Sequence, residues 1–264
     1  MDYPGRIIKM GEQDASLVKL LKVRLNRGLV VGLNTEQLLD TQDPNFGADM
    51  KQVIKLYQAR HVDPLERPLI QDGEVGSITW ESLFGTSSVP ASHQPDTPFL
   101  SRVLAKASGE EARHVREIPP NSNRGPQVEA YLQRVGAQPG LSWCCAFVYW
   151  CFDEAAKDMG MTNPMVRTAG CLDHWSRAPG QGAQRILTAK AVNNPALLQA
   201  GMIFIMDYGS GMGHTGLIES VQGGLITTIE GNTDASRTRE GGGVYRLTRK
   251  IKEVSKGFID YGNN

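Results

Sequence analysis

The strongest constraint on the fold is a change of residue pattern at about residue 201. From there on, short runs rich in β-branched and aromatic residues alternate with glycine-rich turns. The runs are 201–208, 214–221, 224–231, 242–250 and 257–262. Such runs are typical of strands joined by tight turns. We therefore expect an antiparallel sheet in the C-terminal part of the chain.

A helical pattern precedes these runs. Apolar residues recur at helical spacing in residues 99–115, 125–136 and 142–160, and Gly160 is a typical helix stop. Residues 161–200 show neither period, and we expect mostly loop there. Helices followed by strands indicate an α+β domain in which helices pack on an antiparallel sheet.

A separate domain is expected at the N-terminus, since 264 residues suffice for two domains. Two sets of apolar residues there follow helical spacing, namely Leu17, Leu20, Leu21 and Leu25, then Met50, Val53, Ile54 and Tyr57. Residues 86–98 hold three prolines, five serines or threonines and one charged residue, a linker composition. We expect a small all-α domain at 1–85, a linker at 86–98 and the α+β domain at 99–264.

The charge and hydropathy patterns exclude two classes of partner. Lysine plus arginine number 28, as do aspartate plus glutamate, so no net charge attracts nucleic acid. No run is long and apolar enough for membrane insertion. The N-terminal residues also lack the apolar core of a signal peptide. We therefore expect synthesis in the cytoplasm and, for a substrate outside it, a non-classical export route.

The cysteines are candidates for chemistry because all four lie within one short segment, at 144, 145, 151 and 171. A disulfide framework would join distant segments, so we expect reduced thiols. Cys144 begins an apolar helical run, where free backbone N–H groups favour the thiolate and lower the thiol pKa. Buried cysteines more commonly pack as small hydrophobic residues, which is our interpretation of Cys145, Cys151 and Cys171.

A thiolate in acyl transfer needs a base, and His214 is the best candidate. Gly211, Gly213 and Gly216 flank it, and we expect them to let a substrate approach the backbone. The other histidines are His61, His93 and His114, which we expect at the surface, and His174. His174 forms a Cys-x-x-His pair with Cys171, but without a second pair this is weak support for zinc.

The imidazole in turn needs a partner for its second nitrogen. Glu230 and Asn232 end the strand run that follows His214 and lie two residues apart. Residues at this spacing share one face of a strand, so a hairpin would bring both alongside the imidazole. A surface carboxylate and a turn amide remain the alternative interpretation.

Three segments resemble motifs of the CHAP family. Its members are papain-like cysteine hydrolases of peptidoglycan and are related to the NlpC type. Trp143–Trp150 resembles the W-C-A-A-F-V-x-W nucleophile helix, Gly213–Ile218 the G-H-V-G-I-V strand and Ile229–Thr233 the I-E-G-N-T segment. Residues 123–132 are similar to a lead-in seen in one branch of the family. The resemblance departs from the family at Cys145, where alanine is usual, and residues 161–200 carry none of its motifs.

The resemblance implies a site and a chemistry. Cys144 would be the nucleophile, His214 the general base and then acid, Glu230 the residue that orients the imidazole, and Asn232 an assisting polar group. No cofactor or metal would be required. The substrate would be an amide bond of the bacterial cell wall.

The N-terminal domain resembles the three-helix peptidoglycan-binding domain through 43–47, 53–58, 72–76 and 79–85. These segments are similar to D-G-x-F-G, A-V-x-x-F-Q and D-G-x-V-G-x-x-T-W-x-x-L. Residues 28–42 are longer than the corresponding turn of that family. The resemblance implies that this domain holds the enzyme on its substrate.

Several alternatives remain open. The bond cut could be that of an N-acetylmuramoyl-L-alanine amidase or of a stem or cross-bridge endopeptidase. A non-catalytic wall-binding protein is the alternative from another class. The biological role would be that of an antibacterial type VI secretion effector or of a phage-type endolysin. An effector would add an immunity protein and a secretion component to the partners, and either would act in the periplasm or cell wall.

Overall fold

A computed structural model describes residues 1–29, 39–237 and 241–262. By its internal contacts the chain divides into two compact units. The first comprises Met1–Pro90 and Val192–Pro195, and the second comprises Ala91–Ala191 and Ala196–Asn264. Each unit has its own cluster of buried apolar side chains.

The first unit is helical. It contains α1 (Ala15–Leu29), α2 (Ala48–Arg60), α3 (Ser77–Phe84) and the 3-10 turn η2 (Thr86–Ser88). The apolar residues that predicted the first two helices lie in the core of this unit or pack against it. The prediction of an N-terminal helical region is therefore confirmed. Most of segment 28–42, singled out above for its length, lies outside the described residues.

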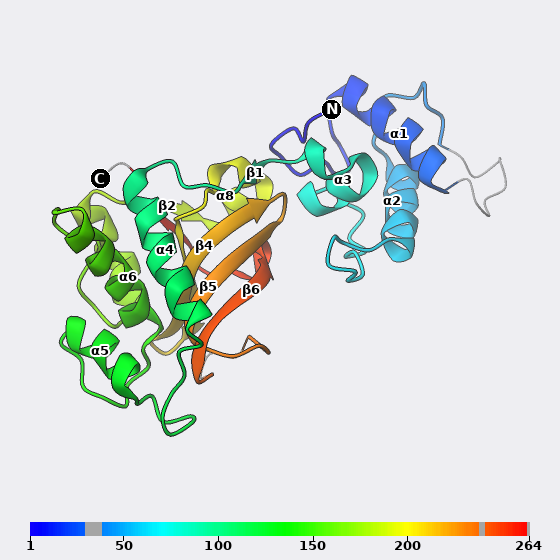
Figure 1. The fold of residues 1–264 in the computed structure, drawn as a ribbon. Helices are drawn as coiled ribbons and strands as arrows, with labels where there is room; N and C mark the ends of the chain where they lie inside the picture. The colour runs from blue at the N-terminus through cyan, green and yellow to red at the C-terminus, as the bar shows by residue number, and fades with distance from the viewer. Residues whose placement is uncertain (30–38, 238–240, 263–264) are drawn as a thin grey trace. The chain divides into compact units, whose positions relative to one another are not determined.

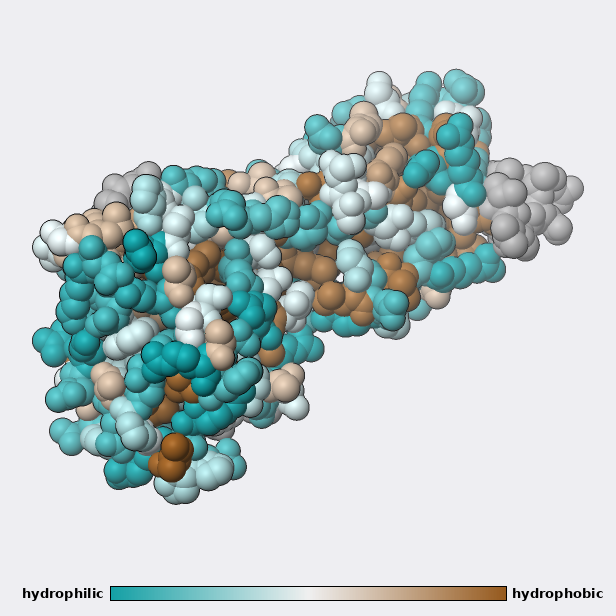
Figure 2. Space-filling model, in the orientation of Figure 1, coloured by the Kyte–Doolittle hydropathy of each residue, from teal (hydrophilic) through white to brown (hydrophobic). Residues whose placement is uncertain are grey.

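The second unit packs helices on a sheet, which confirms the α+β prediction (Figure 1). Its first helices are α4 (Pro98–Ala112), α5 (Pro126–Arg134) and α6 (Cys144–Asp158). α4 and α6 contact β4 and β5, and α5 packs against α6. On the face drawn in Figure 2 the surface over these helices is mainly hydrophilic, as expected of amphipathic helices that bury one side.

The strands form one antiparallel sheet in the order β2-β7-β3-β4-β5-β6, with β1 paired to β4. Their bounds are β1 (Ala91–Ser92), β2 (Gln184–Leu187), β3 (Ile203–Gly209), β4 (Met212–Gln222), β5 (Leu225–Thr233), β6 (Gly243–Lys250) and β7 (Gly257–Asp260). A 3-10 turn, η5 (Ile251–Glu253), separates the last two. The sheet order matters because β4, β5 and β6 are consecutive neighbours, so side chains on one face of these strands lie side by side.

The prediction of mostly loop for residues 161–200 is wrong. This segment contains α7 (Cys171–Arg177), η3 (Ala178–Gln181), β2, α8 (Thr188–Asn193) and η4 (Pro195–Leu197). These elements are short, and their support is distant in sequence: β2 pairs with β7, and α7 packs on β3 and β4. A local pattern cannot reveal elements that depend on such contacts.

The segment with linker composition, 86–98, contains regular elements. It holds η2 and the two-residue strand β1, and α4 begins at Pro98.

In the part of the chain that the structure describes, no helix combines the length and the apolar character needed to cross a bilayer.

Candidate active site

Cys144 is the first residue of α6, as the sequence predicts, and its side chain is buried. The preceding residue, Trp143, makes no side-chain hydrogen bond to the helix start. The first backbone N–H groups of a helix have no partner within the helix. The sulfur therefore lies at a helix end whose N–H groups are suited to stabilising negative charge.

The start of α6 is held by an aromatic group and a buried carboxylate. The Trp143 Nε1 donates to Glu117 Oε1 at 2.9 Å, and Glu117 also accepts from the backbone N–H of Asn123. The Tyr131 ring stacks on Trp143 with centroids 5.6 Å apart and meets the Phe147 ring edge-on. No local sequence signal marks Glu117, because its role depends on a loop that reaches Trp143 from 26 residues away.

The structure brings His214 of β4 and Glu230 of β5 together. The His214 Nε2 and the Glu230 Oε2 are 2.7 Å apart, and both side chains are buried. Gly216 makes this contact possible, because a Cβ there would lie 2.7 Å from the Glu230 Cγ. The Glu230 side chain passes over Gly216 to reach the His214 imidazole. This is the position expected of a residue that orients the imidazole.

Arg249 of β6, which the sequence analysis missed, holds the other side of this carboxylate. Its Nε and Nη2 each lie 2.6 Å from one oxygen of Glu230, a bidentate ion pair. Thr228 also donates to the carboxylate. Burial alone would raise the pKa of Glu230, but Arg249 and His214 outweigh it and lower the pKa to about 2. Glu230 is therefore a fixed negative charge.

His214 interacts with Cys144 as well as with Glu230. Burial alone would lower its pKa, but the interactions with Cys144 and Glu230 outweigh it and raise the pKa to about 9. The Nδ1 atom makes no hydrogen bond to nitrogen or oxygen among the described residues. The ring thus has one nitrogen fixed by Glu230 and the other open to a reacting partner, the arrangement expected of a general base.

A second thiol also lies at Cys144. The Cys144 Sγ and the Cys171 Sγ are 3.4 Å apart, and all four cysteines are free. Cys171 and burial raise the pKa of the Cys144 thiol, and His214 offsets this only in part. The expected lowering of this pKa is therefore wrong, because a neighbouring thiol and a buried setting disfavour the thiolate. The Cys171 thiol also interacts with the Cys145 thiol, so the Cys145 sulfur lies near the site as well.

The glycine at 213 has a different role from the expected one. A Cβ there would lie 2.7 Å from the Met206 carbonyl oxygen and 3.1 Å from the Cys171 Cβ. Gly213 and Gly216 therefore make room for other parts of the protein, whereas a Cβ at Gly211 would meet no atom within 4 Å. The expectation that they admit a substrate to the backbone has no support in these contacts.

Asn232 is buried, but the structure does not join it to the other site residues. Its φ of 57° is in the left-handed region, and the β5–β6 register shifts between Glu230 and Thr233. The simple two-residue alternation expected from the sequence therefore does not apply. Neither amide atom of Asn232 has a hydrogen-bond partner among the described residues.

The other histidines lie outside the site. The His174 Nε2 lies 2.9 Å from the Tyr261 hydroxyl, and burial lowers the pKa of His174 to about 3. Among the described residues, no group of three or more His, Cys, Asp or Glu side chains has the arrangement of a metal site. His61 stacks on Tyr57 in the first unit.

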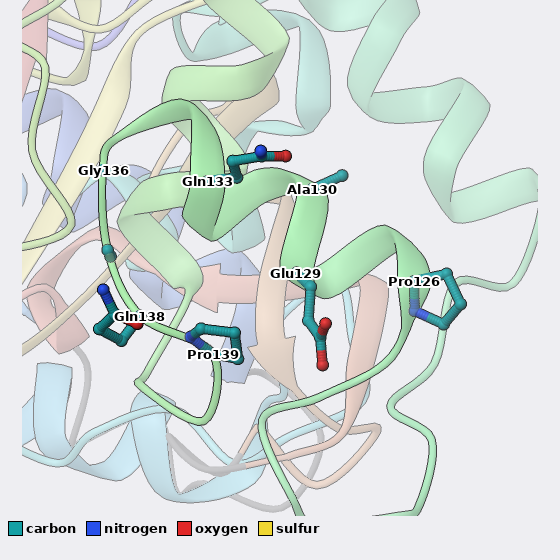
Figure 3. Close-up of a pocket in the computed structure, with 8 residues that line it drawn as sticks. Pro126, Glu129, Ala130, Gln133, Gly136, Gln138 and Pro139 are labelled. Atoms are coloured by element: carbon teal, nitrogen blue, oxygen red, sulfur yellow. The ribbon is translucent and has the colours of Figure 1, made fainter.

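A surface pocket of about 590 Å³ lies elsewhere on the second unit, beside α5 (Figure 3). It is lined by Pro126, Glu129, Ala130, Gln133, Gly136, Ala137, Gln138 and Pro139. None of the predicted site residues lines it.

Comparison with known families gives one match. Residues 136–232 match the CHAP domain, and this range contains Cys144, His214, Glu230 and Asn232 but not Arg249. No family model identifies the N-terminal residues as a peptidoglycan-binding domain. No curated protein and no solved structure matches the chain. A CHAP domain implies a peptidoglycan substrate and a hydrolase of the amidase or peptidase type, generally cysteine-dependent.

Proposed function

We propose that this protein is a cysteine peptidoglycan hydrolase in which Cys144 attacks an amide bond of the cell wall. The observation that carries the proposal is the series Cys144, His214, Glu230, with a buried 2.7 Å contact between the last two. A non-catalytic wall-binding protein would have no need of a buried nucleophile, base and carboxylate in this order. The CHAP match over the same residues supports the assignment.

The reaction begins in molecules whose His214 is neutral, a form that increases as the pH approaches 9: the thiol proton passes to the open nitrogen of His214 as the Cys144 sulfur attacks the carbonyl carbon. Glu230 stabilises the resulting imidazolium, and Arg249 keeps Glu230 charged. The N–H groups at the start of α6 stabilise the oxyanion. His214 then protonates the leaving amine, and an acyl-enzyme thioester remains. Water, deprotonated by His214, hydrolyses the thioester and regenerates the thiol.

The test is replacement of the nucleophile. Cys144→Ala should still sediment with purified cell walls but release no fragments, because loss of a nucleophile removes almost all turnover and leaves binding. Cys145→Ala is the matched control, with the same truncation one residue on in α6, and should remain lytic. Lysis by Cys144→Ala would refute the assignment, whereas an inactive Cys145→Ala would transfer it to the neighbouring sulfur.

The bond cut is that of an amidase, between the lactyl group and L-alanine, or of an endopeptidase in the stem or cross-bridge. Mass spectrometry of the muropeptides released by the wild-type protein distinguishes these activities. A free lactyl carboxyl group identifies the amidase, and a new amine within the peptide identifies the endopeptidase.

We further propose that residues 1–85 bind peptidoglycan and that the protein acts as an antibacterial effector or a phage-type lysin in the periplasm or cell wall. Four free thiols suit synthesis in a reducing compartment. Expression should be harmless in the cytoplasm and toxic when the protein is directed to the periplasm by an added leader. Rescue by the product of an adjacent gene favours the effector, since such a toxin needs an immunity protein.

A further inference from the structure

The site holds a feature that amide hydrolysis does not require, the Cys171 thiol in contact with the nucleophile. Cys144 begins α6 and Cys171 begins α7, and only 3% and 6% of these residues are exposed. A single buried cysteine is ordinary packing. Two free thiols with their sulfurs 3.4 Å apart form a pair that can share chemistry.

The fold fixes the position of Cys171. Its Cβ lies over Gly213, where any side chain would collide with it, and the next residue, Leu172, packs on the same glycine. One turn further along α7, His174 is completely buried and bonded to the Tyr261 hydroxyl. The start of α7 is therefore anchored beside His214 and cannot easily leave the nucleophile.

The separation of the sulfurs is within reach of a covalent bond. A disulfide is about 2.05 Å long, so the sulfurs need to approach by about 1.4 Å. Both cysteines begin a helix, and rotation about their side-chain torsions can bring the two sulfurs together by this amount. Both thiols are free in the structure.

We propose that Cys144 and Cys171 are a redox pair, in which a peroxide converts the nucleophile into a reversible disulfide that switches the hydrolase off. The inference rests on the proposed role of Cys144. In the first step the Cys144 thiol gives its proton to His214, its sulfur attacks one peroxide oxygen and becomes a sulfenic acid, and the O–O bond breaks; His214 passes the proton to the other oxygen, which leaves as water or an alcohol. In the second, the Cys171 sulfur attacks the Cys144 sulfur and displaces hydroxide, the Cys171 thiol proton joins the hydroxide to form water, and the S–S bond forms.

The pair has two consequences for the enzyme. The disulfide removes the lone pair that attacks the substrate, so the oxidised enzyme is inactive. It also removes the sulfenic acid before more peroxide oxidises it irreversibly to the sulfinic acid. A dithiol reductant returns both thiols in a two-electron exchange and is itself oxidised to a disulfide.

The experiment uses the full-length protein, treated with hydrogen peroxide and then with dithiothreitol. Wild-type protein should lose wall hydrolysis, show a Cys144–Cys171 cross-link in peptide mass mapping, and recover most of its untreated activity on reduction. Cys171→Ser should lose activity under the same treatment and recover little of it, with extra oxygen atoms on Cys144. Each protein is compared with its own untreated activity.

Cys145→Ser is the matched control, because Cys145 is the other thiol that interacts with Cys171. It should form the same cross-link and recover like the wild type. A cross-link to Cys145 in place of Cys144, no cross-link in the wild type, or full recovery of Cys171→Ser would each overturn the redox pair. Failure of the proposed function is separate: it requires lysis by Cys144→Ala, a result independent of cross-link formation.

Discussion

The two units each bury a polar motif residue, and the difference between them separates a structural role from the catalytic role proposed above. In the first unit, Gln58 donates to the Asp72 side chain and to the Glu74 carbonyl, and it accepts from the Gly73 backbone. Both of its amide atoms are satisfied. In the second unit, His214 is bonded to Glu230 on one side and open on the other.

This contrast explains what each residue does. A buried amide with every hydrogen bond made rigidifies its surroundings, and Gln58 closes the turn that leads into α3. A buried imidazole nitrogen without a hydrogen bond costs folding free energy, so its presence calls for an explanation. The open nitrogen of His214 shares its site with the Cys144 thiol, as its proposed role as a general base requires.

The largest expected effect comes from Arg249→Met, which breaks the charged network of the second unit. Removing one partner of a buried ion pair leaves the other charge uncompensated and costs about 3–5 kcal/mol. Urea denaturation should show this loss, together with reduced wall hydrolysis. Arg246→Met is the control on the same strand. Arg246 pairs with Glu219 and Glu111, but its side chain is 38% exposed, so water screens these pairs and the loss should be smaller than that of Arg249→Met. Equal losses in both variants would contradict the special role of Arg249.

A smaller effect is expected from Gln58→Ala, which opens the hydrogen-bond network around this buried amide of the first unit. Unsatisfied buried hydrogen-bond groups cost about 1–3 kcal/mol. The loss should appear in denaturation of the first unit, while hydrolysis of small soluble wall fragments at low temperature is retained. Gln52→Ala, a substitution at an exposed position of the same helix, should change stability little. Loss of fragment hydrolysis in folded Gln58→Ala would remove the distinction between the two networks.

A third effect, spread over several pH units, is expected in acid. Because the pKa of Glu230 is lowered from 4.5 to about 2, its charge stabilises the fold above pH 4.5, and this contribution is lost as the pH falls towards 2. One proton changes stability by at most about 1.4 kcal/mol per pH unit. The melting temperature of Glu230→Gln should therefore fall less steeply than that of the wild type over this range. Parallel curves would show that Glu230 does not carry the expected charge.

Local patterns in the sequence determined much of the second unit. The helix starting at Cys144 and the strands carrying His214 and Glu230 were predictable, because periodicity and glycine turns encode regular elements within one segment. The order of a nucleophile, a base and a carboxylate could also be predicted from the types and positions of these residues. That prediction needed only an apolar helix and two neighbouring strands.

Only the tertiary structure decided which residues support Cys144, His214 and Glu230. Arg249 reaches Glu230 because β6 is the next strand in the sheet. Alternation along β6 puts Arg249 on the face of Leu247 and Arg246 on the opposite face, but it does not reveal that β6 pairs with β5. Cys171 reaches Cys144 because α7, in a segment expected to be loop, packs on β3 and β4. Contacts between residues far apart in the chain depend on strand order and helix packing, which no single segment encodes. For this reason the sequence determined the proposed reacting groups, and the assembled fold decided which charge and which second thiol lie beside them.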